Sequence, residues 1–277
     1  QITEIRLRNG RRVSICMGKN NLFLDESGKI LNEPDYAITA YETDIEYAFK
    51  TAFSYSLHSY SKELAMGYVT TRGGNRVGVC GTAVVGSSFK DVETIKYVSS
   101  VNIRIARQVR GFADKIYDEC FCGCDTYKIP SILIIGPPAS GKTTLLRDLS
   151  RLLGTRSRIS LIDSQNEISS TFKNHPENDV GELTDIFVGY PKHSGISSAV
   201  RIMSPNAIIV DEIGTRDELD ALELAFHSGV SLITAVHGKS YSDALNKSSV
   251  RALADMADFE YAVELTGGYN YRIKKIV

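Results

Sequence analysis

One stretch decides how the second half of this 277-residue chain folds: Gly136-Pro137-Pro138-Ala139-Ser140-Gly141-Lys142-Thr143. It satisfies the P-loop pattern GxxxxGK[ST] at every fixed position. The apolar run 131–135 before it predicts a buried strand, and the amphipathic run 142–153 after it, stopped by Gly154, predicts a helix. This strand, loop and helix order is the context in which the pattern binds nucleotide phosphates.

The residue types of this loop suit phosphate binding. Glycines let successive backbone N–H groups turn inward around the phosphates, and the positive end of the helix dipole adds to the attraction. Lys142 is expected to contact the β and γ phosphates, and the Thr143 hydroxyl to bind Mg²⁺, which prefers oxygen ligands. We therefore predict an ATP and Mg²⁺ site; the alternative is an ordinary strand-to-helix turn. Its predicted nucleotide-binding residues are Gly136, Pro137, Pro138, Ala139, Ser140, Gly141, Lys142, Thr143 and Thr144.

A second apolar run, 207–210, ends in two acids, Asp211 and Glu212. A strand neighbouring the P-loop often presents a carboxylate to the phosphate-bound metal in this way. Asp211 is the predicted metal-site residue beside Thr143. Glu212 is the predicted catalytic residue, because phosphoryl transfer depends on positioning and polarising the attacking water. The alternative is a strand followed by a solvated acidic turn.

Three further side chains stand at or just after the ends of predicted strands, where parallel sheets bind ligands. Asp163 ends the run 159–162, and Glu167 follows four residues later. Both acids could face the nucleotide, Asp163 to bind it and Glu167 as a further catalytic carboxylate, although a helix-capping role suits Asp163 equally well. His237 ends the run 230–236, where it could hydrogen-bond a phosphate or an acidic neighbour.

The rest of the chain separates into two patterns. Residues 1–110 contain short alternating runs that predict antiparallel strands, with turns at Asn9-Gly10 and at 72–75 and a further strand at 97–105. A helix is predicted from Thr43, with Glu46 completing a capping box. We predict a smaller α+β domain over 1–110.

Residues 111–277 alternate strand and helix, the pattern of a mostly parallel sheet flanked by helices. A helix is predicted at 216–226, with Thr215 and Glu218 as its capping box, and a final hairpin at 261–276. We predict an α/β domain over 111–277 that carries the P-loop.

Composition excludes several classes of protein. The net charge of −1 and pI near 6.6 give no global attraction to nucleic acid or anionic lipid, although residues 1–110 are net positive. No apolar stretch approaches the roughly 20 residues that a membrane-spanning helix needs. Five cysteines without a secretory signal favour reduced thiols, and Cys120, Cys122 and Cys124 lack the paired spacing of a zinc site. A cytoplasmic location is expected.

The order of these motifs resembles the ATPases of type II, type IV and pilus secretion machines. Those proteins have a P-loop, an acidic box, a second acidic motif introduced by an Arg and a Pro-containing turn, and a histidine box on the next strand. The segment 201–215 resembles most a family from endospore-forming bacteria that acts in sporulation. Where many secretion ATPases have Gly-Glu-Ile-Arg-Asp, this chain departs at 211–217, so no role is transferred to Arg216.

The resemblance implies a RecA-like P-loop ATPase domain and a homohexameric ring that hydrolyses ATP. It also implies integral membrane proteins of a secretion or channel complex as partners, with the chain held peripherally at the membrane. A preceding domain supplies arginines to the γ phosphate in this family, and Arg104 is the first candidate as a further catalytic residue. Arg72, Arg76 and Arg107 are the alternatives.

Two other functions fit the P-loop. A nucleic-acid translocase would use the positive first domain, but the chain lacks interleaved aromatic and basic clusters, so no stable nucleic-acid partner is expected. A regulatory switch would bind ATP with negligible turnover. Salt-dependent oligonucleotide binding would favour the first, and tight ATP binding without phosphate release the second.

Overall fold

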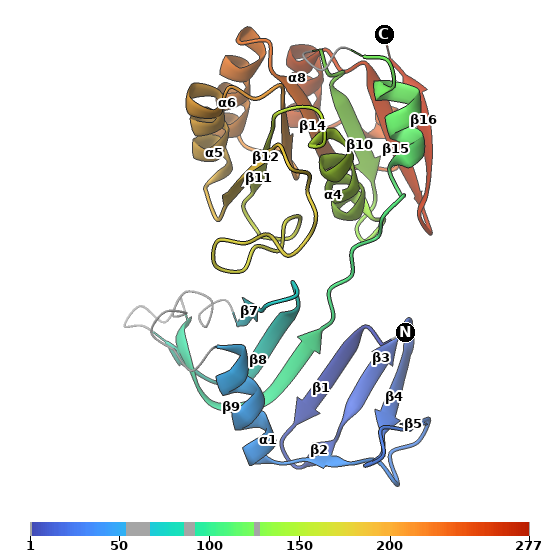
Figure 1. Cartoon of the computed structure of the whole chain (residues 1–277), viewed down its shortest axis with the longest axis vertical. Coiled ribbons are helices and arrows are strands. Elements are labelled where there is room, and N and C mark those ends of the chain that lie inside the picture. Colours follow the sequence, from blue (N-terminus) through green and yellow to red (C-terminus); the bar gives the residue numbers. More distant parts are fainter. Residues whose placement is uncertain (1, 54–66, 86–91, 125–127, 277) are drawn as a thin grey trace. The chain divides into compact units, whose positions relative to one another are not determined.

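The computed structural model describes residues 2–53, 67–85, 92–124 and 128–276. The chain forms two compact units (Figure 1). The N-terminal unit comprises Gln1–Arg107 and Phe172–Glu177, and the P-loop unit comprises Gln108–Thr171 and Asn178–Val277.

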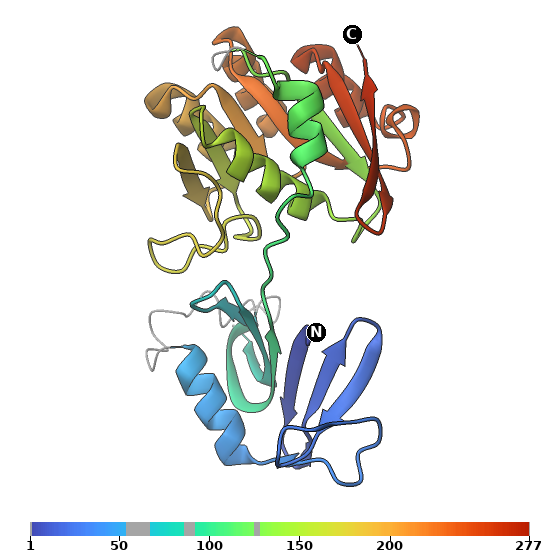
Figure 2. The same cartoon turned by 45° about the vertical axis from the view of Figure 1, so that its right-hand side comes forward.

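The N-terminal unit contains a seven-stranded antiparallel sheet in the order β5-β4-β3-β1-β9-β8-β7. A two-stranded ribbon, β2 with β6, accompanies it, and helix α1 packs on the sheet around buried Ile45 and Phe53 (Figure 2). The elements are β1 Glu4–Arg8, β2 Arg11–Arg12, β3 Ser14–Met17, β4 Asn20–Leu24, β5 Ile30–Leu31, β6 Thr39–Ala40, α1 Glu42–Ala52, β7 Tyr68–Thr70, β8 Arg76–Val85 and β9 Val92–Arg104.

The turn at Asn9-Gly10 is confirmed, and strands β1 and β3 on its two sides pair antiparallel, with Ile5 opposite Ile15. Residues 11–12 between these strands pair with β6. The capping box from Thr43 is wrong, because the helix begins one residue earlier and the Asp44 carboxylate accepts the Tyr41 N–H at 2.8 Å. The hairpin around 72–75 is confirmed.

The P-loop unit is built on a second seven-stranded sheet, in the order β12-β11-β13-β14-β10-β15-β16. All its strand pairs are parallel except β15 with β16. Its elements are α3 Asp114–Ile116, η2 Tyr117–Phe121, β10 Ile132–Gly136, α4 Lys142–Leu153, β11 Ile159–Asp163, β12 Thr184–Val188, α5 Lys192–Ser198, η3 Ala199–Met203, β13 Ala207–Val210, α6 Arg216–His227, β14 Ser231–His237, α7 Tyr241–Ala244, α8 Ser248–Ala257, β15 Tyr261–Gly267 and β16 Asn270–Lys275.

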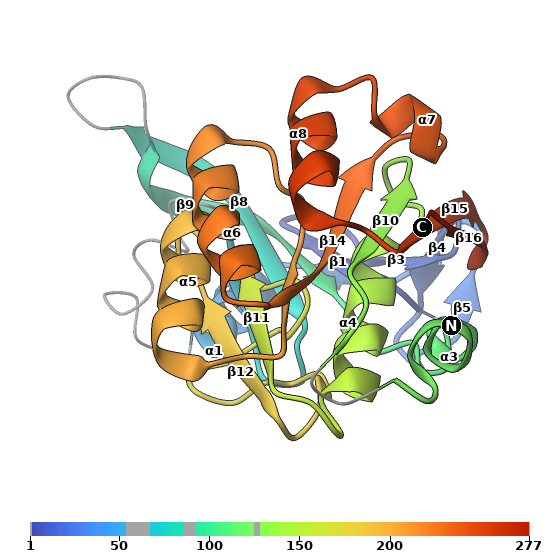
Figure 3. The ribbon, with the colours of Figure 1, turned by 90° about the horizontal axis from the view of Figure 1, so that it is seen from above.

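Helices cover both faces of this sheet (Figure 3). Strand β10 shows why its sequence is apolar throughout: Ile132 and Ile134 belong to the buried cluster on the side of α3 and α4, while Leu133 and Ile135 belong to the one that includes residues of α5, α6 and α8. Because both faces of the strand are buried, apolar and polar residues do not alternate along it. The layered arrangement brings the carboxyl ends of the six parallel strands to one edge, where the P-loop lies.

The predicted strands and helices of this unit are confirmed, including the Thr215–Glu218 capping box of α6. Strand β12 and helix α5 were not predicted. The sequence of β12, TDIFV, mixes polarity at the edge of the sheet, and α5, KHSGISS, has few strong helix formers, so tertiary packing stabilises both. Within the described part of the chain, no helix is both long and apolar enough to cross a membrane.

Candidate functional site

The P-loop turns tightly from β10 into α4, and its glycines are required by space and by backbone angle. A Cβ on Gly136 would lie 2.4 Å from the Ser140 hydroxyl and 3.0 Å from Leu265. Gly141, which precedes the helix, has φ 102°, a backbone angle that residues other than glycine rarely adopt. The predicted strand-loop-helix context is therefore present in three dimensions.

Lys142 lies inside this turn, with 8% of its surface exposed. Its Nζ donates to the carbonyls of Gly136 at 3.1 Å and Pro137 at 3.0 Å, and lies 3.1 Å from Nδ1 of His237. Burial lowers the pKa of the lysine, while the nearby charges of Asp211 and Glu212 act in the opposite direction. A cation held over the loop in this way is placed to meet an anion.

His237 joins the P-loop lysine to the predicted catalytic acid. Strand β14 lies directly beside β10, and His237 is opposite Gly136 in the register. The Nε2 atom of His237 is 3.3 Å from Oε2 of Glu212. A neutral imidazole that carries its proton on Nε2 satisfies both contacts, because Nδ1 then accepts from the lysine and Nε2 donates to the carboxylate. The three side chains form one polar chain.

The backbone of Glu212 is unusual for a residue with a side chain, since its φ is 47°. Left-handed angles at such residues are uncommon and are held by their surroundings. Here Lys192, from the start of α5, donates a hydrogen bond from Nζ to the Glu212 carbonyl. Lys192 was not singled out from the sequence, because its partner lies on a different strand-to-helix connection.

Asp211 lies next to the first turn of α4, where the Thr143 hydroxyl donates to its Oδ2 at 3.3 Å. Burial raises the pKa of Asp211, and the charges of Glu167 and Glu212 act in the same direction, while Lys192 opposes them. The two oxygen groups predicted to serve Mg²⁺ therefore lie together. One expectation is corrected: β13, which Asp211 follows directly, does not adjoin β10, because β14 lies between them.

Asp163 is engaged with its own loop. Its carboxylate accepts from the backbone N–H groups of Glu167, Ile168 and Ser169 and from the Ser169 hydroxyl, at 2.7 to 3.1 Å, and the residue is 3% exposed. These contacts close a loop and do not cap a helix, because residues 164–171 contain none. A part for Asp163 in nucleotide binding stays a prediction. Glu167 is exposed, and its charge acts on the Asp211 carboxyl.

Arg104 belongs to β9 of the N-terminal unit. Its Nε lies 3.4 Å from the Glu4 carboxylate, and 64% of its side chain is exposed. Among the alternatives, Arg76 lies over the ring of Tyr68 at 5.1 Å, and Arg107 donates to the carbonyl of Ile2. Arg104 keeps an accessible guanidinium.

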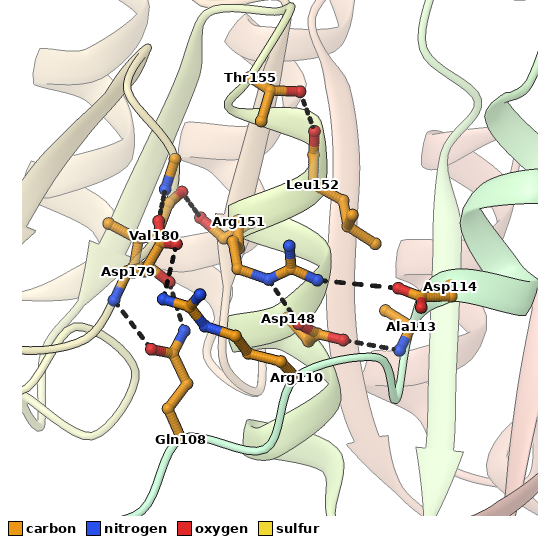
Figure 4. A network of polar contacts seen from close by, with 12 residues as sticks. Gln108, Arg110, Ala113, Asp114, Asp148, Arg151, Leu152, Thr155, Asp179 and Val180 are labelled. Carbon is orange, nitrogen blue, oxygen red and sulfur yellow. Dashed lines mark hydrogen bonds and ion pairs between the residues drawn. The ribbon is translucent and has the colours of Figure 1, made fainter.

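The segment that precedes the P-loop sheet is fastened to α4 by polar contacts (Figure 4). Asp148 of α4 is fully buried and accepts from the Ala113 N–H at 2.9 Å and from Arg151 at 2.8 Å. Further along, Gln108 and Arg110 both contact Asp179. These contacts hold the segment 108–113 in place beside the P-loop helix.

A cavity of about 350 Å³ opens over the P-loop. Residues 139–144 line it together with Gly268 and Tyr269, at the tip of the hairpin between β15 and β16. The sequence analysis did not indicate these two residues as part of the site, because they lie inside the predicted final hairpin at 261–276. More than 120 residues separate them from the P-loop, and only the pairing of β10 with β15 brings them together.

The residues present fit ATP with Mg²⁺. Among the described residues, the Ser140 hydroxyl is buried without a hydrogen-bond partner, inside a glycine turn next to the Lys142 cation. A phosphate oxygen bound in this turn would accept a hydrogen bond from the Ser140 hydroxyl and so supply the partner that it lacks. A hydroxyl and a carboxylate side by side, Thr143 and Asp211, supply the oxygen chemistry that Mg²⁺ prefers.

Comparison with known proteins identifies the family of the chain. The family model described as "Sporulation stage III, protein AA" matches residues 1–273. Stage III sporulation protein AA of Bacillus subtilis (strain 168) is 35% identical over 272 residues, covering 96% of this chain and 83% of that protein.

Solved structures share the fold. The pilus retraction motor PilT with bound ADP is 16% identical, with a TM-score of 0.65 over 99% of this chain and 79% of that chain. The Legionella pneumophila ATPase DotB is 13% identical, with a TM-score of 0.54 over 95% and 71%. The predicted α/β fold with a RecA-like, mostly parallel sheet is confirmed. By the match over nearly its whole length, the chain belongs to the sporulation stage III protein AA family.

Proposed function

We propose that this protein binds Mg²⁺ and ATP at the P-loop and hydrolyses the γ phosphate. One observation carries the proposal: the chain of contacts from Lys142 through His237 to Glu212, set beside the Thr143–Asp211 pair. A cation for phosphate, an oxygen pair for a metal and a carboxylate for water are the parts that phosphoryl transfer needs.

Each side chain then has one task. Lys142 neutralises charge on the β and γ phosphates, exchanging its two carbonyl contacts for phosphate oxygens. Asp211 and Thr143 hold Mg²⁺, which supplies charge neutralisation when bound. Glu212 orients and polarises the attacking water, and Lys192 holds its backbone in the left-handed conformation that aims the side chain. Glu167 is the alternative carboxylate for this task.

His237 links nucleotide binding to the catalytic carboxylate. In the structure its imidazole contacts Lys142 through Nδ1 and Glu212 through Nε2. When Lys142 turns to phosphate, Nδ1 loses its donor, and the ring is free to reorient with Glu212. The Glu212 carboxylate then responds to the occupancy of the P-loop.

We further propose that the protein works as a homohexameric motor for a membrane channel or secretion complex during sporulation, located in the cytoplasm at the face of that complex. Membership of a sporulation family and the fold shared with a pilus retraction motor support this role. An arginine of the N-terminal unit, first Arg104, completes the site by placing a cation opposite the P-loop, an arrangement worth about 10³ to 10⁵ in rate in related systems.

Two substitutions test the chemistry. Lys142→Ala should abolish ATP binding, since it removes the buried cation of the loop, whereas Lys239→Ala, at an exposed position, should not. Binding is measured by calorimetry, and ATP at about a hundred times its Kd should stabilise the wild type by about 2.7 kcal/mol. Glu212→Gln should bind ATP normally and release phosphate far more slowly, with exposed Glu223→Gln as its control.

The outcomes separate the competing functions. ATP binding without phosphate release in the wild type would identify a nucleotide-dependent switch. Salt-dependent oligonucleotide binding that stimulates turnover would identify a nucleic-acid ATPase. Unchanged turnover in Glu212→Gln would transfer the catalytic role to Glu167.

Assembly is tested by diluting the full-length protein while measuring turnover per chain and mass by light scattering. Turnover should fall as the ring dissociates. Arg104→Ala should lose turnover at every concentration and keep its mass, whereas Arg11→Ala, an exposed arginine of β2, should behave as wild type. Full activity in Arg104→Ala would reassign the role to Arg72, Arg76 or Arg107.

A further inference from the structure

The cavity over the P-loop is lined by more than the phosphate-binding loop. Its volume, about 350 Å³, falls within the range of about 300 to 1,000 Å³ typical of pockets that enclose a whole small ligand. Phosphate-binding groups line one part of it, at residues 139–144. Gly268 and Tyr269 line another part, so the cavity combines a charged region with an aromatic one.

Tyr269 is presented to this cavity by a strained turn. Its φ is 62°, and it follows Gly267 and Gly268 with φ 91° and 61°. Left-handed angles suit glycine or asparagine, and a bulky aromatic residue there is an outlier. The hairpin therefore retains an aromatic side chain where the backbone favours a smaller one, which points to a role for the ring.

The ring of Tyr269 also packs against other aromatic side chains. Phe112 meets Tyr269 edge to face, with ring centroids 5.1 Å apart and planes at 88°, and Tyr271 packs on Phe112 at 5.6 Å. A Cβ added to Gly141 would lie 3.4 Å from the Phe112 ring, so this aromatic group rests against the P-loop itself.

Polar contacts fix Phe112 in turn. The next residue, Ala113, donates its backbone N–H to the buried Asp148 of α4 (Figure 4). Helix α4 begins at Lys142, so the phosphate-binding turn and the aromatic support belong to one rigid framework. Tyr269, 57% exposed, is the one member of the group that lies mostly open to solvent.

We propose that Tyr269 is the platform on which the nucleobase of the bound nucleotide stacks, with Phe112 and Tyr271 as its support. This assignment rests on the proposed nucleotide function and adds the base-binding part of the same site. Aromatic rings stack on bases through their faces, and loss of such a stack weakens binding by about 5- to 150-fold.

The test is calorimetric titration of full-length protein with Mg²⁺ and ADP. Tyr269→Ala should weaken ADP binding by about tenfold or more, whereas Tyr269→Phe, which keeps the ring, should stay within about twofold of wild type. The matched control is Tyr190→Ala, because Tyr190 is also exposed and also meets a buried phenylalanine, Phe187, edge to face at 5.4 Å. It should bind ADP as the wild type does.

Photolabelling gives a second, independent readout. Irradiation with 8-azido-ADP should attach the base to the peptide that contains Tyr269, as located by mass spectrometry. Labelling confined to other peptides, or unchanged ADP affinity in Tyr269→Ala, would overturn the assignment while leaving the P-loop function intact. Absence of ADP binding to the wild type would overturn both, and equal loss in Tyr269→Phe and Tyr269→Ala would show that stacking is not the cause.

Discussion

Replacing Asp148 by alanine should destabilise the P-loop unit strongly, although the residue touches no predicted ligand site. Its carboxylate is fully buried on α4. One oxygen accepts from the Ala113 N–H at 2.9 Å and the other from Arg151 at 2.8 Å. Arg151 keeps a more distant contact with exposed Asp114, at 3.7 Å. The substitution therefore leaves one buried N–H unpaired and one largely buried guanidinium with a single weak partner.

The magnitude follows from these contacts. Hydrogen bonds to charged groups contribute about 1.5 to 3 kcal/mol each, and breaking a buried ion pair costs about 3 to 5 kcal/mol. We expect a loss of about 3 to 5 kcal/mol for Asp148→Ala. The control is Asp220→Ala on α6, which breaks an exposed pair with Arg216. Such a pair contributes about 0.3 to 0.5 kcal/mol.

Differential scanning calorimetry of full-length protein provides the measurement. For a unit of this size, about 3 to 5 kcal/mol corresponds to a fall in Tm of about 6 to 20 °C, against less than about 2 °C for Asp220→Ala. Asp148→Asn, which keeps an acceptor but loses the charge, should fall between them. If Asp148→Ala shifted Tm no more than Asp220→Ala does, the reasoning that the buried carboxylate fastens residues 108–113 would be refuted.

Two further substitutions test the pH dependence and the packing. Burial raises the pKa of Asp211 in the folded protein above the unfolded value of about 3.9. Between these two pKa values the folded state binds the proton more tightly, so the stability of the ligand-free protein falls as pH rises from about 3.9 through the folded pKa. Asp211→Asn should remove that fall, so the ligand-free variant should be more stable than wild type at neutral pH, while it should lose stabilisation by Mg²⁺ and ATP. Urea unfolding across pH 4 to 8, with and without Mg²⁺ and ATP, measures both effects. Identical pH profiles for the variant and the wild type would contradict the assignment. Gly181→Ala should destabilise by about 2 to 4 kcal/mol, because its φ is 96° and the new Cβ would lie 2.6 Å from Gly154. Gly189→Ala, at φ 70° with open space around it, should lower the free energy of unfolding by only about 1 kcal/mol. Equal losses of stability in the two variants would show that the backbone angle, and not the close contact, determines the effect.

The sequence alone determined those features that depend on neighbours along the chain. The P-loop and the helix 142–153 were predicted with their observed bounds, because glycine geometry, helix periodicity and the stop at Gly154 are local signals. The capping box of α6 was predicted for the same reason. Residue type at the ends of predicted strands is also a local signal, and it indicates Asp211, Glu212 and His237 as candidates for chemistry without indicating the contacts between them.

Tertiary structure alone decided which of these groups meet. The order of strands places β14 between β10 and β13, so that His237 lies between Lys142 and Glu212, and strand order is a non-local property that periodicity does not encode. Asp163 closes its own loop, because its carboxylate accepts hydrogen bonds from donors at residues 167–169. The spacing of residues along the sequence did not distinguish this role from a contact with the nucleotide. Tyr269 reaches the P-loop only through the pairing of β10 with β15, since the sheet unites residues that the chain keeps far apart.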